Sequence, residues 1–289
     1  MFNDDGWILG TYGPPLTPDI IREKMIAPYT DSPVDVFLWS VGGHDVYDFE
    51  TEIGERFGDS GCDDLDDRQQ RRKANLRYLS DNHGGPLTVI SSLCHDRGLR
   101  FFPSVRMNEH YDMAESSPSY GRLRREYPDF LIGKPGEEIP HLSLEWGIRT
   151  GLDYAVDEAR NHKLSIILEL IEHFDIDGIE LDFMRHPAFF RVEEAYAHRY
   201  LLTDMVSQVR SALDAKGRAL NREVSLAIRV PPTLHDCSRI GLDVEDWLRQ
   251  DLVHLLIAGG GFIPFHMPIR SFVDAARGSV EHGCIVGRF

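Results

Sequence analysis

The stretch FDIDGIELDFMRHP places two acidic residues inside an apolar run. Glu180 and Asp182 are two positions apart, and the side chains of a strand alternate between its two faces, so both carboxylates are expected on the same face. An ionised carboxylate in an apolar interior is costly unless it is paired or solvated. The spacing therefore predicts either a site that uses carboxylates for acid–base chemistry or a buried ion-pair network.

Arginines occur on the two segments that are expected to flank this strand. LRFFPSVRMNE places Arg106 and Asn108 on one face, and SLAIRVP places Arg229 on the equivalent face. We expect Arg106 and Arg229 to reach the carboxylates of Glu180 and Asp182 from either side. The alternative is a neutral core network that only fixes the register of the strands. The number of charged groups gathered at the strand ends favours a functional site.

These residues lie on short β-rich segments that alternate with helical patterns, which is typical of parallel strands joined by crossover helices. We predict a TIM (β/α)8-type barrel formed by one domain over residues 1–289, with about seven strands and incomplete at the C-terminus, as in a fragment. A doubly wound open sheet is the second choice. Amphipathic helices are expected at 157–174, 200–213 and 244–249. The expected strands cover residues 34–43, 99–109, 177–185, 223–232, 252–262 and 284–289, with a first strand ending near residue 4.

In such a barrel the apolar face of the acidic strand packs on the outer helices. Ile179, Leu181 and Phe183 form that face, so the acidic face is expected to look into the barrel. Asp182 would then lie nearer the mouth at the carboxyl ends of the strands, where barrel enzymes keep their active sites. The long connection over 110–155 is rich in Pro, Gly, Ser and Tyr, and long connections of this kind are usually functional.

Composition limits the classes of partner. A formal net charge of −16 argues against a general affinity for nucleic acid or an anionic membrane, and no apolar run approaches the roughly 20 residues of a membrane span. The glycines at 259–261 lack GxGxxG spacing, so no dinucleotide cofactor is expected. The four cysteines form no CxxC pair and are interpreted as free thiols. Without signal-peptide features the default expectation is a cytoplasmic protein, or a secreted or periplasmic one if a leader is missing.

Three segments together resemble a known family. DGIELDFMRHP, FFPSVRMNEHYD before it and RVPPTLHDCSRIGLDVEDWLRQDLVHLLIAGGG after it are similar to the family-ten-like glycosyl hydrolases. The resemblance covers nearly the whole chain, and its specific part is the motif on the fourth strand. It implies a TIM barrel and the hydrolysis of glycosidic bonds in a polysaccharide or oligosaccharide, and it is stronger for fold than for activity.

A more distant similarity is to the chitinase-like barrels, which carry a DGxDxDxE signature on the fourth strand. Asp177 and Gly178 match its start, Glu180 stands at the first inner Asp and Asp182 matches the second. The final Glu, the general acid of that family, is replaced by Met184. A thioether cannot donate a proton, so the chitinase mechanism does not transfer to this chain.

The family resemblance implies one protonated and one ionised carboxyl group. Asp182 is the first catalytic candidate because it is expected nearest the mouth. Glu180 is deeper and could have the raised pKa that an acid requires, or it could only orient its neighbours. Glu109 is the reserve for the second catalytic carboxyl. The other acidic residues expected at the mouth are Asp4 or Asp5, with Asp4 counted among the substrate-binding residues, and Asp112.

Side chains near the same strand ends are expected to bind the carbohydrate. Asn108, His110, Arg185 and His186 would contact sugar hydroxyls or an anionic substituent. Trp39 would stack on a sugar ring, or would instead pack between the sheet and the helices. Trp146 and Tyr154 are weaker candidates for stacking.

The arginines suggest a kind of substrate. Arg106, Arg185 and Arg229 in one pocket would suit a uronic or sulfated sugar, because guanidinium groups match the geometry of carboxylate and sulfate.

Two other functions compete with glycoside hydrolysis. A carbohydrate-binding or degenerate barrel without turnover is favoured by Met184 and by the incomplete set of strands. A metal-dependent hydrolase would need a histidine pair on the first strand, and FNDDG offers carboxylates only, so no metal is expected. No GxSxG motif supports serine chemistry.

Overall fold

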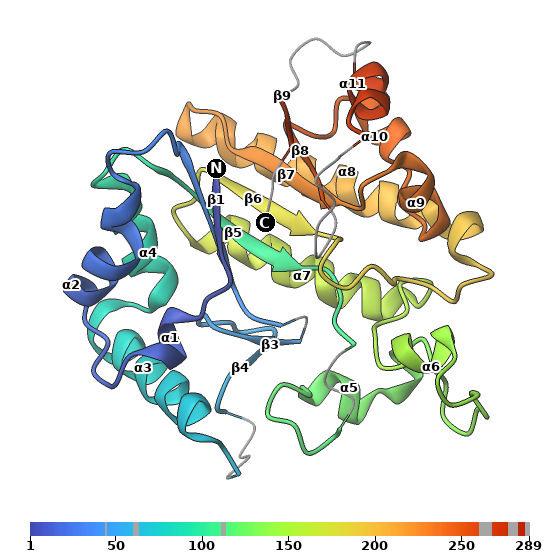
Figure 1. Cartoon of the computed structure of the whole chain (residues 1–289), viewed down its shortest axis with the longest axis horizontal. Coiled ribbons are helices and arrows are strands. Elements are labelled where there is room, and N and C mark those ends of the chain that lie inside the picture. The colour runs from blue at the N-terminus through green and yellow to red at the C-terminus, as the bar shows by residue number, and fades with distance from the viewer. Residues whose placement is uncertain (44, 60–63, 111–113, 260–267, 277–282, 287–289) are drawn as a thin grey trace.

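A sheet of seven parallel strands, curled into part of a barrel, forms the centre of the computed structural model (Figure 1). The strands follow one another across the sheet in their order along the chain, with helices in most of the connections. A doubly wound sheet would reverse its order at a switch point, so the barrel prediction is confirmed. The strands, in order across the sheet, are β1 (Phe2–Asp4), β2 (Val36–Ser40), β5 (Arg100–Arg106), β6 (Gly178–Asp182), β7 (Ser225–Val230), β8 (Leu255–Ala258) and β9 (Gly283–Val286).

The sheet is open within the described part of the chain. β1 and β9 are its two edges and do not pair with each other there, so the barrel is incomplete, as the predicted number of strands indicated. Asp112, Cys62 and the last two glycines of the run at 259–261 lie outside the described residues, and only the backbone of β9 is described. The described residues are 1–43, 45–59, 64–110, 114–259, 268–276 and 283–286.

The three predicted helices are present. The first is α7, the second extends further at both ends than its apolar pattern indicated, and the third has the predicted bounds. None of the described helices is long and apolar enough to cross a membrane. The helices are α1 (Ile8–Thr11), α2 (Pro18–Ile21), the π-helix η1 (Arg22–Ile26), the 3-10 helix η2 (Ala27–Tyr29), α3 (Asp67–His83), α4 (Pro86–His95), α5 (Arg122–Glu126), the 3-10 helix η3 (Pro128–Phe130), α6 (Leu144–Ile148), α7 (Asp157–His173), α8 (Ala195–Leu220), α9 (Leu234–Arg239), α10 (Val244–Arg249) and α11 (Arg270–Ala276).

The outer face of the sheet packs on the helices. Ile179, Leu181 and Phe183 are fully buried in the same core cluster as Ile167 and Leu170 of α7, as the alternation of side chains predicts. This is the largest apolar cluster among the described residues, and its burial supplies most of the hydrophobic stabilisation of the barrel.

A second apolar cluster fills the barrel interior below the polar positions. It contains Leu38, Phe102, Ala227 and Ile257, which come from β2, β5, β7 and β8. On three of these strands the inward-facing residues change from apolar to polar toward the carboxyl end. The interior therefore has an apolar floor and a polar mouth.

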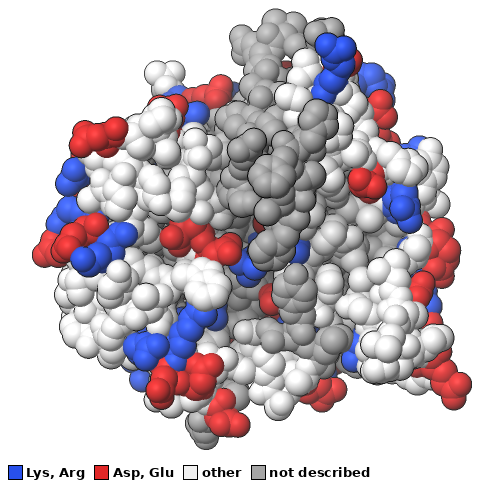
Figure 2. All heavy atoms as spheres, viewed as in Figure 1, with Lys and Arg blue, Asp and Glu red and all other residues white. Residues whose placement is uncertain are grey.

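Short elements surround the mouth. Two strands missed by the sequence analysis, β3 (Val46–Tyr47) and β4 (Glu55–Arg56), form a small parallel sheet between β2 and α3. The long connection over 110–155 contains α5, η3 and α6 (Figure 1). Cys94 and Cys237 are buried free thiols, which agrees with their interpretation from the sequence. Acidic and basic side chains are interspersed over the face shown in Figure 2.

Candidate active site

Three strands align their polar residues in rows across the mouth. Asp182 of β6 lies in register with Arg106 of β5 on one side and with Arg229 of β7 on the other. One pleat deeper, Glu180 lies in register with Ser104. The predicted order of the three strands and the shared face of their charged residues are therefore confirmed.

Glu180 is the most enclosed of the carboxylates. Its side chain is fully buried, and Oε1 accepts hydrogen bonds from Nε and a terminal nitrogen of Arg229 at 2.9 and 2.5 Å. Asn3 of β1 donates to Oε2 at 3.3 Å, and Ser104 also bonds to the carboxylate. Burial raises the pKa of Glu180, the charge of Asp182 adds to the rise, and Arg229 opposes it. Protein donors thus hold both of its oxygens.

Asp182 is held by one oxygen only. Its Oδ1 accepts hydrogen bonds from the backbone N–H groups of Met184 and Arg185 at 2.9 and 3.0 Å, and Nε of Arg229 lies 3.8 Å away. The other oxygen, Oδ2, accepts no hydrogen bond from any residue that the structure describes. The carboxylate is therefore fixed in direction and keeps one oxygen for another partner.

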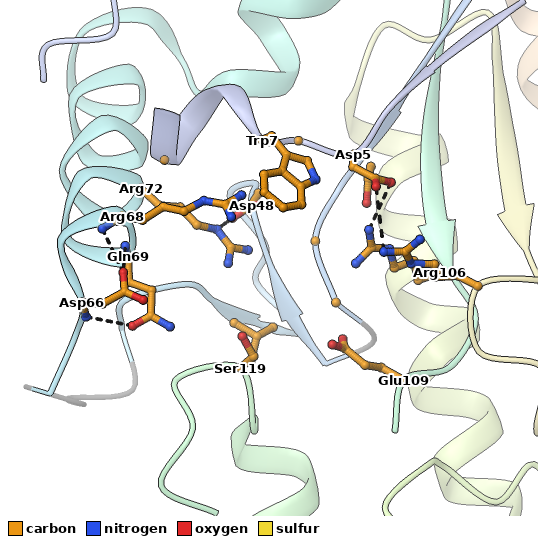
Figure 3. Close-up of a pocket in the computed structure, with 17 residues that line it drawn as sticks. Asp5, Trp7, Asp48, Asp66, Arg68, Gln69, Arg72, Arg106, Glu109 and Ser119 are labelled. Atoms are coloured by element: carbon orange, nitrogen blue, oxygen red, sulfur yellow. Dashed lines mark hydrogen bonds and ion pairs between the residues drawn. The ribbon is translucent and has the colours of Figure 1, made fainter. Parts of the chain in front are cut away.

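Arg106 does not pair with the carboxylates of β6, which corrects the sequence-based expectation. Its guanidinium contacts Asp5 at 3.2 Å, and Arg185 lies 3.9 Å from the other oxygen of Asp5 (Figure 3). Asp5 competes successfully because it follows β1 and faces the mouth. Of the two adjacent acids, Asp4 belongs to the opposite face and accepts a hydrogen bond from the N–H of Gly6, so its predicted place in the site is wrong.

A cavity of about 270 Å³ opens beside this part of the mouth (Figure 3). It lies between the ends of β1, β2 and β5, the start of α3 and the long connection. Formal charges of both signs line it in equal numbers, so its electrostatic character depends on which of them are paired. Its charged lining residues are Arg68, Arg72, Arg106, Arg185, Asp5, Asp48, Asp66 and Glu109.

Glu109 faces this cavity from just beyond the end of β5. The strand ends at Arg106, three residues before the predicted end at Glu109. Strand alternation therefore does not decide where Glu109 points. Its side chain is almost buried, and a Cβ added at Gly43 would lie only 2.5 Å from its Oε2. The absence of a side chain at Gly43 therefore makes room for this carboxylate at the cavity wall.

A buried lysine lies behind the same segment. Lys163 of α7 is fully buried and donates to the hydroxyl of Tyr47 at 3.0 Å and to the carbonyl of Arg106 at 3.3 Å. Burial lowers the pKa of Lys163 to about 7, while the charges of Asp45 and Glu109 oppose this shift. The lysine thus connects the helix layer to the end of β5.

Asn108 is a structural residue rather than a sugar contact. Its side chain is almost fully buried, and Nδ2 donates to the carbonyls of Leu152 and Ala188 at 2.9 and 2.6 Å. Oδ1 accepts from the N–H groups of Leu152 and Glu109. The amide thereby ties together three loops at the mouth, and no part of it is left for a ligand.

The aromatic candidates also have structural roles. Trp39 is fully buried in the outer core cluster, so the packing interpretation of this residue holds and stacking on a sugar ring is excluded. Tyr154 is fully buried and donates its hydroxyl to the carbonyl of Met107. Trp146 is half-buried beneath the guanidinium of Arg149.

The two histidines lie against each other at the mouth. The rings of His110 and His186 are 4.9 Å apart in an edge-to-face arrangement. His186 is almost fully buried, and burial together with the nearby cationic groups lowers its pKa to about 3. His186 is therefore neutral and shielded from a substrate, whereas His110 is half-buried and Arg185 is partly exposed.

Sequence reasoning missed the residues on the far side of the cavity. Trp7, Arg68, Arg72 and Asp48 line it, and none of them belongs to a predicted strand with charged alternation. The available signal was DDRQ, in which Asp66 and the residue three positions later form a capping box at the start of α3. Recognising that start would have placed the arginines of the first two turns of α3 near the mouth. Within the described residues, no three potential ligands are grouped as a metal site.

The fold is similar to that of larger proteins that act on carbohydrates. A cycloisomaltooligosaccharide glucanotransferase from Paenibacillus sp., solved with cycloisomaltoheptaose, has a TM-score of 0.57 at 11% identity, with 96% of this chain and 37% of that chain covered. An α-galactosidase from Thermus thermophilus has a TM-score of 0.46 at 15% identity, with 96% and 45% covered. For an α-amylase from Lactobacillus plantarum the TM-score is 0.47 at 11% identity, with 88% and 51% covered.

The similarity to the glucanotransferase shows the fold. The chain spans between 37% and 51% of the length of the three neighbours, so their activities do not extend to it directly. No family model matches the chain, and no curated protein matches it. Membership of the family-ten-like hydrolases therefore stays a prediction.

Proposed function

We propose that this chain is a glycoside hydrolase that cleaves a polysaccharide or oligosaccharide at the carboxyl-terminal mouth of its barrel. The observation that carries the proposal is the half-engaged carboxylate of Asp182. One oxygen is anchored by two backbone N–H groups, and the other accepts no hydrogen bond from the described residues. A group fixed in this way is suited to act as a nucleophile or to stabilise positive charge at the anomeric carbon.

Glu109 is the proposed proton donor. Glycoside hydrolysis needs a second carboxyl group, and Glu109 is the member of the predicted catalytic set that lines the cavity. Glu180 is unsuitable because both of its oxygens are bonded inside the protein. We assign it a positioning role, in which it holds Arg229 against Asp182.

The resemblance to family-ten-like hydrolases and the likeness of fold to a carbohydrate-active enzyme support a carbohydrate substrate. His110 and Arg185 remain the sequence-predicted candidates for contact with it, because both retain exposed surface at the mouth.

A screen for new reducing ends in a panel of neutral, uronic and sulfated oligosaccharides tests the proposal. Release by the unmodified chain that disappears in Asp182→Asn supports it. Release that persists in the variant would remove Asp182 from the mechanism.

Carbohydrate binding without turnover is the second candidate. It is favoured by the buried network around Glu180, in which Arg229, Asn3 and Ser104 bond to its carboxylate, since such a network can fix structure without chemistry. Oligosaccharide binding by calorimetry, combined with no reducing ends from any bound sugar, would establish this candidate instead.

A further inference from the structure

A stacked pair of side chains stands at the cavity wall opposite Glu109. The guanidinium carbon of Arg68 lies 3.6 Å from the centre of the Trp7 ring, and Trp7 is 54% exposed. In Figure 3, Arg68 and Arg72 extend toward the cavity from α3, and Trp7 lies between them and the pair formed by Asp5 and Arg106. The indole face restrains the arginine, which would otherwise be a mobile surface side chain.

Among the described residues, Arg68 differs from the other arginines of the cavity in having no anionic partner. Arg72 bonds to Asp48 at 2.8 Å, and Arg106 bonds to Asp5. For Arg68, no ion pair or side-chain hydrogen bond is present within the part of the chain that the structure describes. Its positive charge is therefore held in the cavity wall without an ion pair to any carboxylate of the described residues.

The carboxylate of Asp66, two residues before Arg68, bonds to the backbone and not to the guanidinium of Arg68. Asp66 accepts the backbone N–H groups of Arg68 and Gln69, both at 2.8 Å, and caps the positive end of α3. Across the cavity, one carboxylate, that of Asp5, lies between two guanidinium groups. These two walls therefore carry four guanidinium groups and three carboxylates, and the fourth carboxylate of the cavity, that of Glu109, lies on the opposite wall.

A glycine fixes the course of the Arg68 side chain. A Cβ added at Gly10 would lie 2.7 Å from Cγ of Arg68 and 3.2 Å from its Nε. The side chain of Arg68 therefore runs directly across the backbone of Gly10 before it reaches Trp7. Any larger residue at position 10 would displace the Arg68 side chain, so the absence of a side chain at Gly10 leaves the space that this conformation occupies.

We propose that Trp7 and Arg68 form a subsite for an anionic sugar unit, one that carries a carboxylate or a sulfate ester. The guanidinium fork binds the anionic oxygens, and the exposed part of the indole packs against the apolar face of the ring. This inference deepens the proposed function, because the subsite shares its cavity with Glu109. The cavity volume of about 270 Å³ suits a single sugar unit better than a long segment of chain.

The inference differs from the earlier expectation for an anionic sugar. That expectation relied on Arg106, Arg185 and Arg229, and the structure gives each of these a carboxylate within 4 Å. Among the described arginines of the cavity, Arg68 is the one that a substrate can bind without breaking an ion pair.

Calorimetric binding of three oligosaccharides of equal length, one uronic, one sulfated and one neutral, tests the subsite. We expect Arg68→Gln to weaken binding of an anionic oligosaccharide about tenfold and to leave binding of the neutral one unchanged. Arg77→Gln is the matched control, because Arg77 is exposed on the same helix outside the cavity. Gly10→Ala, which keeps the charge but displaces the side chain, should weaken anionic binding as well.

Comparison of the affinities for the uronic and the sulfated oligosaccharide shows whether the subsite prefers a carboxylate or a sulfate. Equal effects of Arg68→Gln on charged and neutral oligosaccharides, or no binding of either anionic oligosaccharide, would overturn the subsite. Binding is measured apart from turnover, so the two proposals can fail separately. If Arg68→Gln loses affinity for the anionic oligosaccharides alone and the unmodified chain cleaves none of them, the subsite is supported and the hydrolase is rejected.

Discussion

Arg229 donates two hydrogen bonds to a single oxygen of Glu180, at 2.9 and 2.5 Å, and its Nε lies 3.8 Å from Asp182. One guanidinium on β7 thus contacts both carboxylates of β6. This arrangement explains how two acids are tolerated on the inner face of one strand, because the cation between them offsets the cost of burying their charges.

Removal of Arg229 should destabilise the fold strongly. In Arg229→Met the buried Glu180 loses its cationic partner, and an unpaired buried charge costs about 3–5 kcal/mol. Urea denaturation gives the free energy of unfolding, and Arg77→Gln serves as a surface control. Adding Glu180→Leu should recover much of the loss, since the fully buried carboxylate is then removed and the remaining one, on Asp182, keeps its two backbone N–H donors. A single variant that loses less than about 1 kcal/mol would show that the pair is not important for stability.

Asn108→Asp should also destabilise the fold, although the change is nearly isosteric. It replaces the Nδ2 donor with an acceptor that faces the carbonyls of Leu152 and Ala188. We expect a loss of about 3 kcal/mol, because buried acceptors are left unsatisfied. Asn82→Asp, at an exposed position of α3, is the matched control. Thermal denaturation of the two variants measures the difference, and equal melting temperatures would contradict the structural role of Asn108.

Lys163 should make stability depend on pH. Its pKa is about 7 in the fold and 10.5 ordinarily, so between these values the unfolded chain binds more protons than the folded one. Stability contributed at this position should therefore rise with pH by about 1 kcal/mol per unit above pH 7. The measurement is the difference in unfolding free energy between the unmodified chain and Lys163→Met at pH 7 and pH 9. The unfolding free energy of the unmodified chain should rise relative to that of the variant between pH 7 and pH 9, and a constant difference would exclude the lowered pKa.

Strand alternation allowed part of this site to be predicted. The inward direction of Glu180 and Asp182 and the approach of Arg229 depend only on the period of two and on the order of parallel strands. Both hold because these positions lie within strands whose opposite face is buried.

The errors occur where strands end or a neighbour competes. Alternation directs Arg106 to the carboxylates of β6, but Asp5 pairs with it instead, and the sequence does not reveal that Asp5, just after β1, faces the mouth. Asn108 lies beyond β5, where its amide forms hydrogen bonds with the neighbouring loops. For Trp39 the sequence allows both stacking on a sugar ring and packing in the core, and only the packing of the fold distinguishes these two roles. Arg68 was missed because it comes from a helix start, where no alternation marks a site.

The division of labour between Asp182 and Glu109 is the central claim, and substrates with different leaving groups test it most directly. The measurement is kcat for an unactivated oligosaccharide and for its 4-nitrophenyl glycoside, whose leaving group needs no protonation. Glu109→Gln should lose at least about 100-fold on the first substrate and retain most activity on the second, whereas Asp182→Asn should lose both. Retention of activity on either substrate by Asp182→Asn, or equal losses on both by Glu109→Gln, would contradict the assignment.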